Sequence, residues 1–149
     1  MFTQDIKDKK SNGNGYNFID LFAGAGGLSE GFFQAGFNPV AHVEMNPYAA
    51  QTLETRSCYY YLKKINNLES YYNYLRGNIS RTEFIRHIPE EVLKTVLCET
   101  MSKQSLPGIF RRIDTILRED AVNQVDVIIG GPPCQAYSLV GRAQSHHME

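Results

Sequence analysis

The chain has 149 residues, of which 42% are hydrophobic and 21% charged, and its formal net charge is −1. This length is enough for one folded domain with a hydrophobic core, and the composition is typical of a globular protein. No apolar run reaches the roughly 20 residues of a membrane-spanning helix, and the N-terminus lacks the apolar stretch of a signal peptide. The charge neither supports nor excludes a nucleic-acid partner, although compact DNA-binding modules are usually clearly basic.

The three cysteines are Cys58, Cys98 and Cys134. They are odd in number and widely spaced, and they form no Cys-x-x-Cys pair, so they indicate neither a disulfide framework nor a zinc site. The adjacent His146 and His147 are too few ligands to indicate a metal site. We therefore expect no metal and a reducing, intracellular setting such as the cytoplasm.

Predicted strands and helices alternate along the chain after a polar N-terminal stretch, residues 1–16, which we expect to be a flexible tail. Apolar runs predict buried strands over 17–22, 39–43 and 125–129. Helices are predicted over 28–35 with Ser29 as a cap, from Asn46-Pro47 to about residue 56, and over about 109–117. This alternation predicts an α/β fold with a parallel sheet.

Residues from about 57 to 120 are expected to form an insertion rich in tyrosine, with clusters at 59–61 and 71–74. The rings either pack on the domain or form a base-stacking surface, and packing is favoured because few basic residues alternate with them. Residues 76–80 are predicted to form a turn after a short strand. Residues 89–102 are predicted to form a helix, because four aliphatic residues repeat there at helical spacing.

The segment from Phe18 to Leu28 is an apolar strand followed by a glycine-rich turn and a helix. This order is typical of the entry to a nucleotide-binding βαβ unit, in which glycine lets the backbone approach a ligand. Glu44 ends the next predicted strand, where an acid can accept hydrogen bonds from the ribose of an adenosine. Ser29 stands where a dinucleotide fingerprint has its third glycine, so the pattern disfavours NAD and FAD relative to S-adenosylmethionine.

The last predicted strand runs directly into Gly130-Gly131-Pro132-Pro133-Cys134-Gln135. Two prolines stiffen the backbone just before the thiol. A cysteine held beside a cofactor pocket is a candidate nucleophile, acting as the thiolate. Cys58 and Cys98 are interpreted instead as buried structural cysteines.

Three segments together resemble the N-terminal part of the catalytic domain of DNA (cytosine-5)-methyltransferases: residues 20–27, 44–49 and 130–138. They follow the order of that family and span residues 18 to about 142. The resemblance implies a Rossmann-like sheet of the class I S-adenosylmethionine-dependent methyltransferases, truncated after about its fourth strand. Residues 17–142 would form the N-terminal part of the catalytic domain, and 143–149 the start of a truncated catalytic loop.

The resemblance also implies a role for each matching residue. Cys134 would be the catalytic nucleophile. The flipped cytosine would contact Pro132, Pro133, Gln135 and Ser138. Asn78 and Ile79 stand where the family usually has Asp-Ile. S-adenosylmethionine, and its product S-adenosylhomocysteine, would be bound by Asp20, Phe22, Ala23, Gly24, Gly26, Gly27, Leu28, Glu44, Met45, Asn78, Ile79 and Pro133.

The family transfers a methyl group to carbon 5 of a flipped cytosine in double-stranded DNA, in restriction-modification systems or as an orphan enzyme. Its Glu-Asn-Val and Gln-x-Arg-x-Arg segments and its target-recognition region are not found in this sequence. We therefore expect the isolated chain to be inactive, and to self-associate or to be completed by a C-terminal half. Three alternatives stay open: a non-catalytic S-adenosylmethionine-binding or split-enzyme subunit, a tRNA cytosine-5 methyltransferase relative, and a nicotinamide-dependent oxidoreductase.

Overall fold

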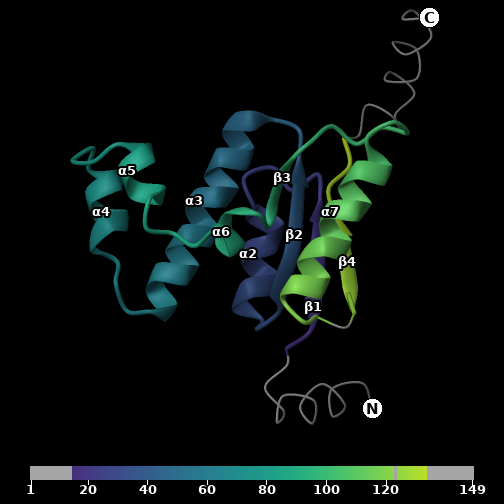
Figure 1. Ribbon diagram of the computed structural model, residues 1–149, viewed down its shortest axis with the longest axis horizontal. Helices are drawn as coiled ribbons and strands as arrows, with labels where there is room; N and C mark the ends of the chain where they lie inside the picture. The colour runs from purple at the N-terminus through teal and green to yellow at the C-terminus, as the bar shows by residue number, and fades with distance from the viewer. Residues whose placement is uncertain (1–14, 123, 134–149) are drawn as a thin grey trace, which may run out of the picture.

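The computed structural model describes residues 15–122 and 124–133. Within them, four parallel strands form one sheet in the order β3-β2-β1-β4 (Figure 1). The strands are β1 (Asn17–Leu21), β2 (Asn38–Glu44), β3 (Val96–Cys98) and β4 (Val127–Gly130). The predicted α/β fold with a parallel sheet is confirmed, and three of these strands lie where the apolar runs predicted them.

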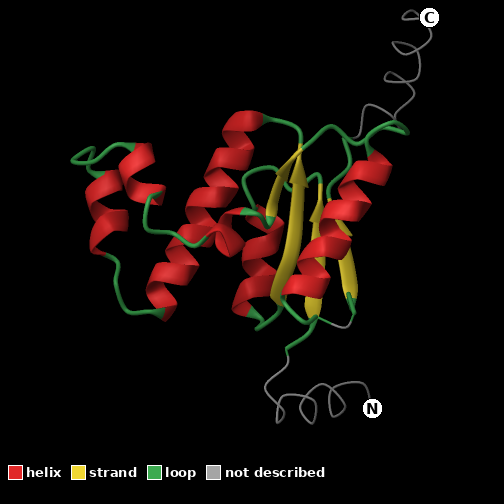
Figure 2. Cartoon of the chain, viewed as in Figure 1, coloured by secondary structure: helices red, strands yellow, loops and turns green. Residues whose placement is uncertain are grey.

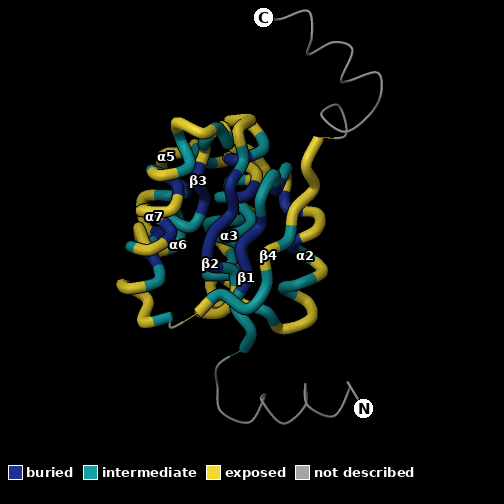
Figure 3. Tube along the Cα trace, turned by 90° about the vertical axis from the view of Figure 1, so that its right-hand side faces the viewer, coloured by how far each residue is buried: buried dark blue, intermediate teal, exposed yellow. Residues whose placement is uncertain are grey.

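Helices cover both faces of this sheet (Figures 2 and 3). Helices α2 (Gly27–Gln34) and α3 (Pro47–Lys64) lie on one face and α7 (Leu106–Glu119) on the other. The larger core lies under α7, where its isoleucines meet the strands. That core comprises Ile19, Val40, Ala41, Val43, Leu97, Ile109, Ile113 and Ile116. Burial of these apolar side chains is the main force that holds the layers together.

Residues 66–93 form a helical insertion beside the end of α3 (Figure 1). It contains α4 (Glu69–Leu75), α5 (Arg81–Ile85) and α6 (Glu90–Leu93). Its own apolar cluster joins Phe84 and Ile88 to Cys58 and Leu62 of α3, and Tyr61, Tyr71 and Tyr74 pack against this cluster. The rings of Tyr74 and Phe84 stack 4.7 Å apart. These tyrosines therefore pack on the fold, as the favoured interpretation predicted.

Two sequence predictions in this part of the chain are wrong. Residues 89–102 do not form one helix: α6 ends at Leu93, and Val96 and Leu97 belong to strand β3. Their spacing fits a helix, but their side chains face opposite sides of the sheet, Val96 toward α3 and Leu97 toward α7. The turn at 76–80 likewise follows helix α4 and not a strand. Strand β3 and helix α7 thus belong to the sheet layers, although they lie within the range 57–120 expected as an insertion.

The helix boundaries differ from prediction at two further places. Asn46 caps α3 as predicted, because its side chain accepts from the backbone N–H groups of Tyr48 and Ala49, but the helix continues to Lys64. Ser29 does not cap α2. The N-cap is Gly26, and Ser29 is buried inside the first turn. None of the described helices is long and apolar enough to cross a membrane.

Candidate functional site

The candidate site lies where the direction of the sheet changes. The chain moves from β1 to β2 on one side and later returns to β4 on the other side of β1. In doubly wound sheets, ligands bind at the carboxyl ends of the strands at this switch point. Gly130 ends β4 there, and a Cβ on it would overlap the carbonyl oxygen of Leu21. The close approach of the two strand ends therefore requires glycine at this position.

The turn that follows β1, residues 22–26, has an unusual backbone. Phe22, Gly24 and Gly26 all have positive φ, of 57°, 55° and 84°. Two backbone bonds brace it, from Ala23 N to the Val43 oxygen at 3.1 Å and from Gly26 N to the Ala23 oxygen at 2.9 Å. A Cβ on Gly26 would also lie 2.8 Å from Leu53 Cδ2. The turn thus needs glycine at Gly26 for both its conformation and its packing.

Glu44 connects this turn to the end of β2. Its Oε2 accepts from Gly24 N at 2.7 Å, and its Oε1 accepts from Asn46 N at 2.7 Å. A carboxylate has about four acceptor sites, so about two remain for ligand hydroxyl groups. Among the described residues, a Cβ built on Gly24 or Gly27 would meet no atom within 4 Å, so this part of the structure leaves the outer side of the turn open. The residues therefore fit the ribose and backbone-approach requirements of an adenosine cofactor.

Exposed apolar side chains lie next to the turn and to Glu44 in the sequence. Leu28 is 50% exposed, Met45 63% and Tyr48 78%. Tyr48 lies in the first turn of α3, and the sequence analysis did not assign it to the site. Such side chains provide apolar contacts for a nucleobase, and the Tyr48 ring is flat.

Asp20 was predicted to bind the cofactor, but its carboxylate is buried in the protein interior. It is 1% exposed and accepts a hydrogen bond from Ser29 Oγ, which lies 3.3 Å from His42 Nδ1. Burial raises the pKa of Asp20, the bond from Ser29 opposes this, and the Glu44 charge adds to the rise. Burial, with a smaller effect from Arg56, lowers the pKa of His42 to about 4.

The structure brings most of the predicted site residues to one edge of the sheet. Pro132 and Pro133 are exposed just after β4, next to the strand end that carries the glycine turn. The predicted residues at this edge are Phe22, Ala23, Gly24, Gly26, Gly27, Leu28, Glu44, Met45, Pro132 and Pro133. Cys134, Gln135 and Ser138 lie outside the described residues.

Asn78 and Ile79 are not brought to this edge. Asn78 is exposed between α4 and α5 and bonds to Asn73, while Ile79 packs on the cluster of the helical insertion. The polar residue that follows β3 is Glu99, whose backbone N–H donates to the Glu44 carbonyl at 3.0 Å. Sequence reasoning missed Glu99 because the strand before it was interpreted as helix.

The other two cysteines differ from each other. Cys58 is buried, and burial raises the pKa of its thiol to about 11, which fits the predicted structural role. Cys98 is exposed at the end of β3, so its predicted burial is wrong. Among the described residues, no group of three or more His, Cys, Asp or Glu is arranged to hold a metal ion.

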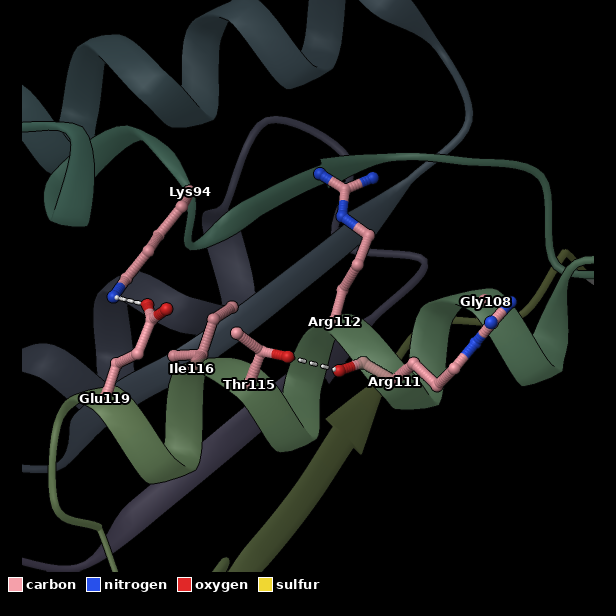
Figure 4. A pocket seen from close by; sticks show the side chains of 7 residues that line it. All are labelled: Lys94, Gly108, Arg111, Arg112, Thr115, Ile116 and Glu119. Carbon is pink, nitrogen blue, oxygen red and sulfur yellow. Dashed lines mark hydrogen bonds and ion pairs between the residues drawn. The ribbon is translucent and has the colours of Figure 1, made fainter.

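The described surface also has hollows that are not lined by the residues of the glycine turn. A groove of about 480 Å³ runs along α7 and is lined by Lys94, Gly108, Arg111, Arg112, Thr115, Ile116 and Glu119 (Figure 4). Ion pairs engage two of its cations: Lys94 pairs with Glu119 at 2.8 Å, and Arg112 with Glu99 at 3.2 Å. A second hollow of about 320 Å³ lies between α2 and α3, lined by Glu30, Arg56, Tyr59, Tyr60 and Tyr71.

Comparison with known proteins points to one family. The family model of C-5 cytosine-specific DNA methylases matches residues 16–85 and 88–148. The type II methyltransferase M.Bpa9945I of Bacillus paralicheniformis is 40% identical, over 85% of this chain and 32% of the relative. The putative type II methyltransferase M.MjaORF1200P of Methanocaldococcus jannaschii is 36% identical, over 81% and 36%. Type II methyltransferase M1.HphI of Haemophilus parahaemolyticus is 33% identical, over 84% and 23%.

The chain therefore spans about a third of the length of the relatives most similar to it among these, and no solved structure matches it. The family match covers most of the sequence, including the glycine turn, Glu44 and the segment after β4. With the sheet topology and the position of that turn, it shows that the chain belongs to the C-5 cytosine-specific DNA methylase family.

Proposed function

We propose that this chain provides the S-adenosylmethionine site and the nucleophile of a DNA cytosine-5 methyltransferase. The observation that carries the proposal is the contact between Gly24 N and the Glu44 carboxylate, 2.7 Å long, at the switch point of the sheet. It holds an open glycine turn and a ribose-binding acid in one rigid unit. The whole reaction also needs the parts that the relatives carry beyond the matched third of their length.

The residues at the sheet edge divide the cofactor between them. Glu44 accepts hydrogen bonds from the two ribose hydroxyl groups with its remaining acceptor sites. The open backbone at Gly24 and Gly27 lies against the methionine portion. Phe22 and Met45 contact the adenine. Glu99 replaces Asn78 as the acid after β3; its Oε1 pairs with Arg112, which leaves Oε2 for the adenine amino group.

Cys134 carries the chemistry on the base. Carbon 5 of cytosine is a weak nucleophile, and a thiolate that bonds to carbon 6 moves electron density onto carbon 5. S-adenosylmethionine would supply the electrophilic methyl group, which bonds to carbon 5 as the sulfonium–methyl bond breaks and S-adenosylhomocysteine leaves. Loss of the proton from carbon 5 and of the thiolate from carbon 6 then restores the aromatic ring. Pro132 and Pro133 fix the direction of the chain just before Cys134, and the target base leaves the duplex to reach it.

The description of the matching family, C-5 cytosine-specific DNA methylase, favours DNA as the substrate. We propose a role in restriction-modification, in the cytoplasm where the DNA of a bacterial cell lies. The edge of β4 is where a complementing C-terminal part, or a second copy, joins the sheet. Ile128 is 66% exposed on that strand.

Calorimetric titration with S-adenosylhomocysteine tests the cofactor site. Replacing Glu44→Ala removes hydrogen bonds to a charged acceptor and should weaken binding by about 10- to 100-fold, since such bonds contribute about 1.5–3 kcal/mol. Glu99→Ala should weaken binding by a smaller factor. Asn78→Ala is the matched control and should leave the affinity unchanged.

Three outcomes would contradict the assignment. Unchanged affinity in Glu44→Ala would remove the ribose contact. Weaker binding in Asn78→Ala, with unchanged binding in Glu99→Ala, would assign the adenine contact to Asn78 in the helical insertion. Tight binding of NAD in place of S-adenosylhomocysteine would favour the nicotinamide alternative.

A further inference from the structure

Three polar side chains are buried beneath the glycine turn and take no part in the proposed chemistry. Asp20 is 1% exposed, and Ser29 and His42 are 2% exposed. Burying polar groups is unfavourable unless they are hydrogen-bonded to one another. Apolar residues at these three positions would avoid this cost. We therefore look for a role of the polar side chains that apolar residues could not fill.

The three groups form one chain of hydrogen bonds across three elements. Ser29 Oγ, on α2, donates to Asp20 Oδ2 on β1 and lies 3.3 Å from His42 Nδ1 on β2. A serine hydroxyl has a single proton, and here it points to Asp20. With Asp20 ionised, the donor count assigns the His42 proton to Nδ1, which donates to Ser29 Oγ. The hydrogen bonds then run in one direction, from His42 to Ser29 and from Ser29 to Asp20.

This chain of bonds closes the glycine turn at its base. Asp20 lies before the turn and Ser29 after it, so their bond fixes both ends of residues 21–28. The turn holds Phe22 at a φ of 57°, which is unfavourable for a residue with a Cβ. Such a backbone persists only when its surroundings determine it. The bond to Asp20 also fixes the start of α2, whose first residues line the turn.

We propose that Asp20, Ser29 and His42 are positioning residues that hold the glycine turn in its cofactor-binding conformation without touching the cofactor. The link to the cofactor rests on the proposed function. For Asp20 this replaces the direct contact expected from the sequence with an indirect one. The open side of Gly24 and its bond to Glu44 thus depend on the bond between Asp20 and Ser29, on the buried side of the same turn.

The next residue of α2 offers a matched control. Glu30 accepts from Tyr60 Oη at 2.6 Å and pairs with Arg56 on the partly exposed side of the helix. Tyr60→Phe removes one side-chain hydrogen bond from α2, whereas Ser29→Ala removes two, with Asp20 and with His42. Tyr60→Phe leaves the bond between Asp20 and Ser29 in place.

Amide hydrogen exchange on the free chain tests the positioning directly. In Ser29→Ala, the amides of Gly24 and Gly26 should exchange about tenfold faster or more, in line with the loss of at least one buried hydrogen bond. The amides of Ile113 and Ile116 in α7 report opening of the whole sheet and should change less. Affinity for S-adenosylhomocysteine should fall by about tenfold. Tyr60→Phe should show neither effect on the turn.

The two readouts separate this inference from the proposed function. Unchanged exchange at Gly24 and Gly26 in Ser29→Ala would overturn the positioning role, whatever the titration gives. Equally faster amide exchange in α7 would also overturn it, because the three side chains would then stabilise the whole domain and not the turn in particular. If the wild-type chain did not bind S-adenosylhomocysteine, the proposed function would fail, while the exchange data would still decide whether the network holds the turn.

Discussion

The glycine turn and the helical insertion both contain residues with positive φ, but for different reasons. In the insertion these are Asn66 and Gly77, with φ of 54° and 75°, and each lies just after a helix, where left-handed residues commonly end helices. At the turn, Phe22, Gly24 and Gly26 precede a helix and leave part of the backbone open. Gly26 is also the N-cap of α2, but Phe22 and Gly24 lie outside any helix, and their conformation shapes a surface.

The interiors of the two regions differ in the same way. The insertion packs aromatic and aliphatic side chains around Phe84, as ordinary folding cores do. The turn lies over Asp20, Ser29 and His42, which are polar and nearly fully buried. The difference teaches that burial alone does not mark a site. Buried polarity next to a left-handed backbone is the combination that indicates one.

The largest expected effect on stability comes from the insertion. Phe84 is 1% exposed and stacks on Tyr74, so Phe84→Ala should lower the free energy of unfolding by about 3–5 kcal/mol. Because the insertion holds no part of the proposed cofactor site, the folded protein should keep its affinity for S-adenosylhomocysteine. Urea unfolding and calorimetry on the same sample measure both quantities.

The control for Phe84 is Tyr72→Ala, which removes a ring that is 45% exposed on α4 and should change stability far less. A loss of affinity in a well-folded Phe84→Ala sample would show that the two regions are coupled. The comparison between them would then fail at its main point.

The second effect is a pH dependence of the free energy of unfolding, caused by a histidine buried beneath the turn. The pKa of His42 is lowered from 6.5 to about 4, so the unfolded chain takes up a proton that the folded protein excludes. The free energy of unfolding should therefore fall as the pH drops from 6.5 toward 4, by on the order of 3 kcal/mol. Asp20 acts in the opposite sense, because its raised pKa makes the folded state bind a proton first.

Urea unfolding across this pH range measures the loss. In His42→Gln the part of the loss due to His42 should disappear. His87→Gln, which changes an exposed histidine of the insertion, should keep the wild-type slope. Equal slopes in His42→Gln and in the wild type would mean that the buried histidine does not set the pH dependence.

The sequence predicted the parts of the fold that depend on local patterns. Apolar runs located β1, β2 and β4, and Asn46-Pro47 located the start of α3, because strand burial and helix capping are written in neighbouring residues. Strand β3 was missed because three residues are too few to show a period of two. The spacing of Val92, Leu93, Val96 and Leu97 also matches a helix that tertiary packing overrides.

The candidate site was predicted in outline and not in its buried parts. The spacing of Gly24 and Glu44 brought both to the strand ends, where they form a hydrogen bond. Neither the bond of Asp20 to Ser29 nor the place of His42 could be read from spacing. The first depends on how α2 packs on β1, and the second on the register that pairs Asp20 with His42. Asn78 was misplaced relative to the sheet edge for the same reason that β3 was missed.

The smallest expected effect on stability comes from replacing a glycine by alanine, in the turn or in the insertion. The two replacements should differ clearly in their effect on cofactor binding. Gly26 and Gly77 have φ of 84° and 75°, so an alanine at either position costs about 1–2 kcal/mol in backbone strain. At Gly26 the new Cβ would also press on Leu53, whereas at Gly77 it would meet no atom of residues 15–122 or 124–133 within 4 Å. Leu53 Cδ2 is the end of a side chain in the buried cluster between α3 and the sheet, so it can move only slightly.

Gly26→Ala should therefore shift the turn and weaken S-adenosylhomocysteine binding by more than about tenfold, if one bond to Glu44 is lost. Gly77→Ala, with nearly the same backbone cost, should bind like the wild type. Thermal unfolding of both variants measures the cost of the backbone strain, and calorimetry measures the affinity for S-adenosylhomocysteine. Similar affinities would mean that the left-handed turn serves folding alone, and the distinction between a site and an ordinary helix end would no longer hold for this protein.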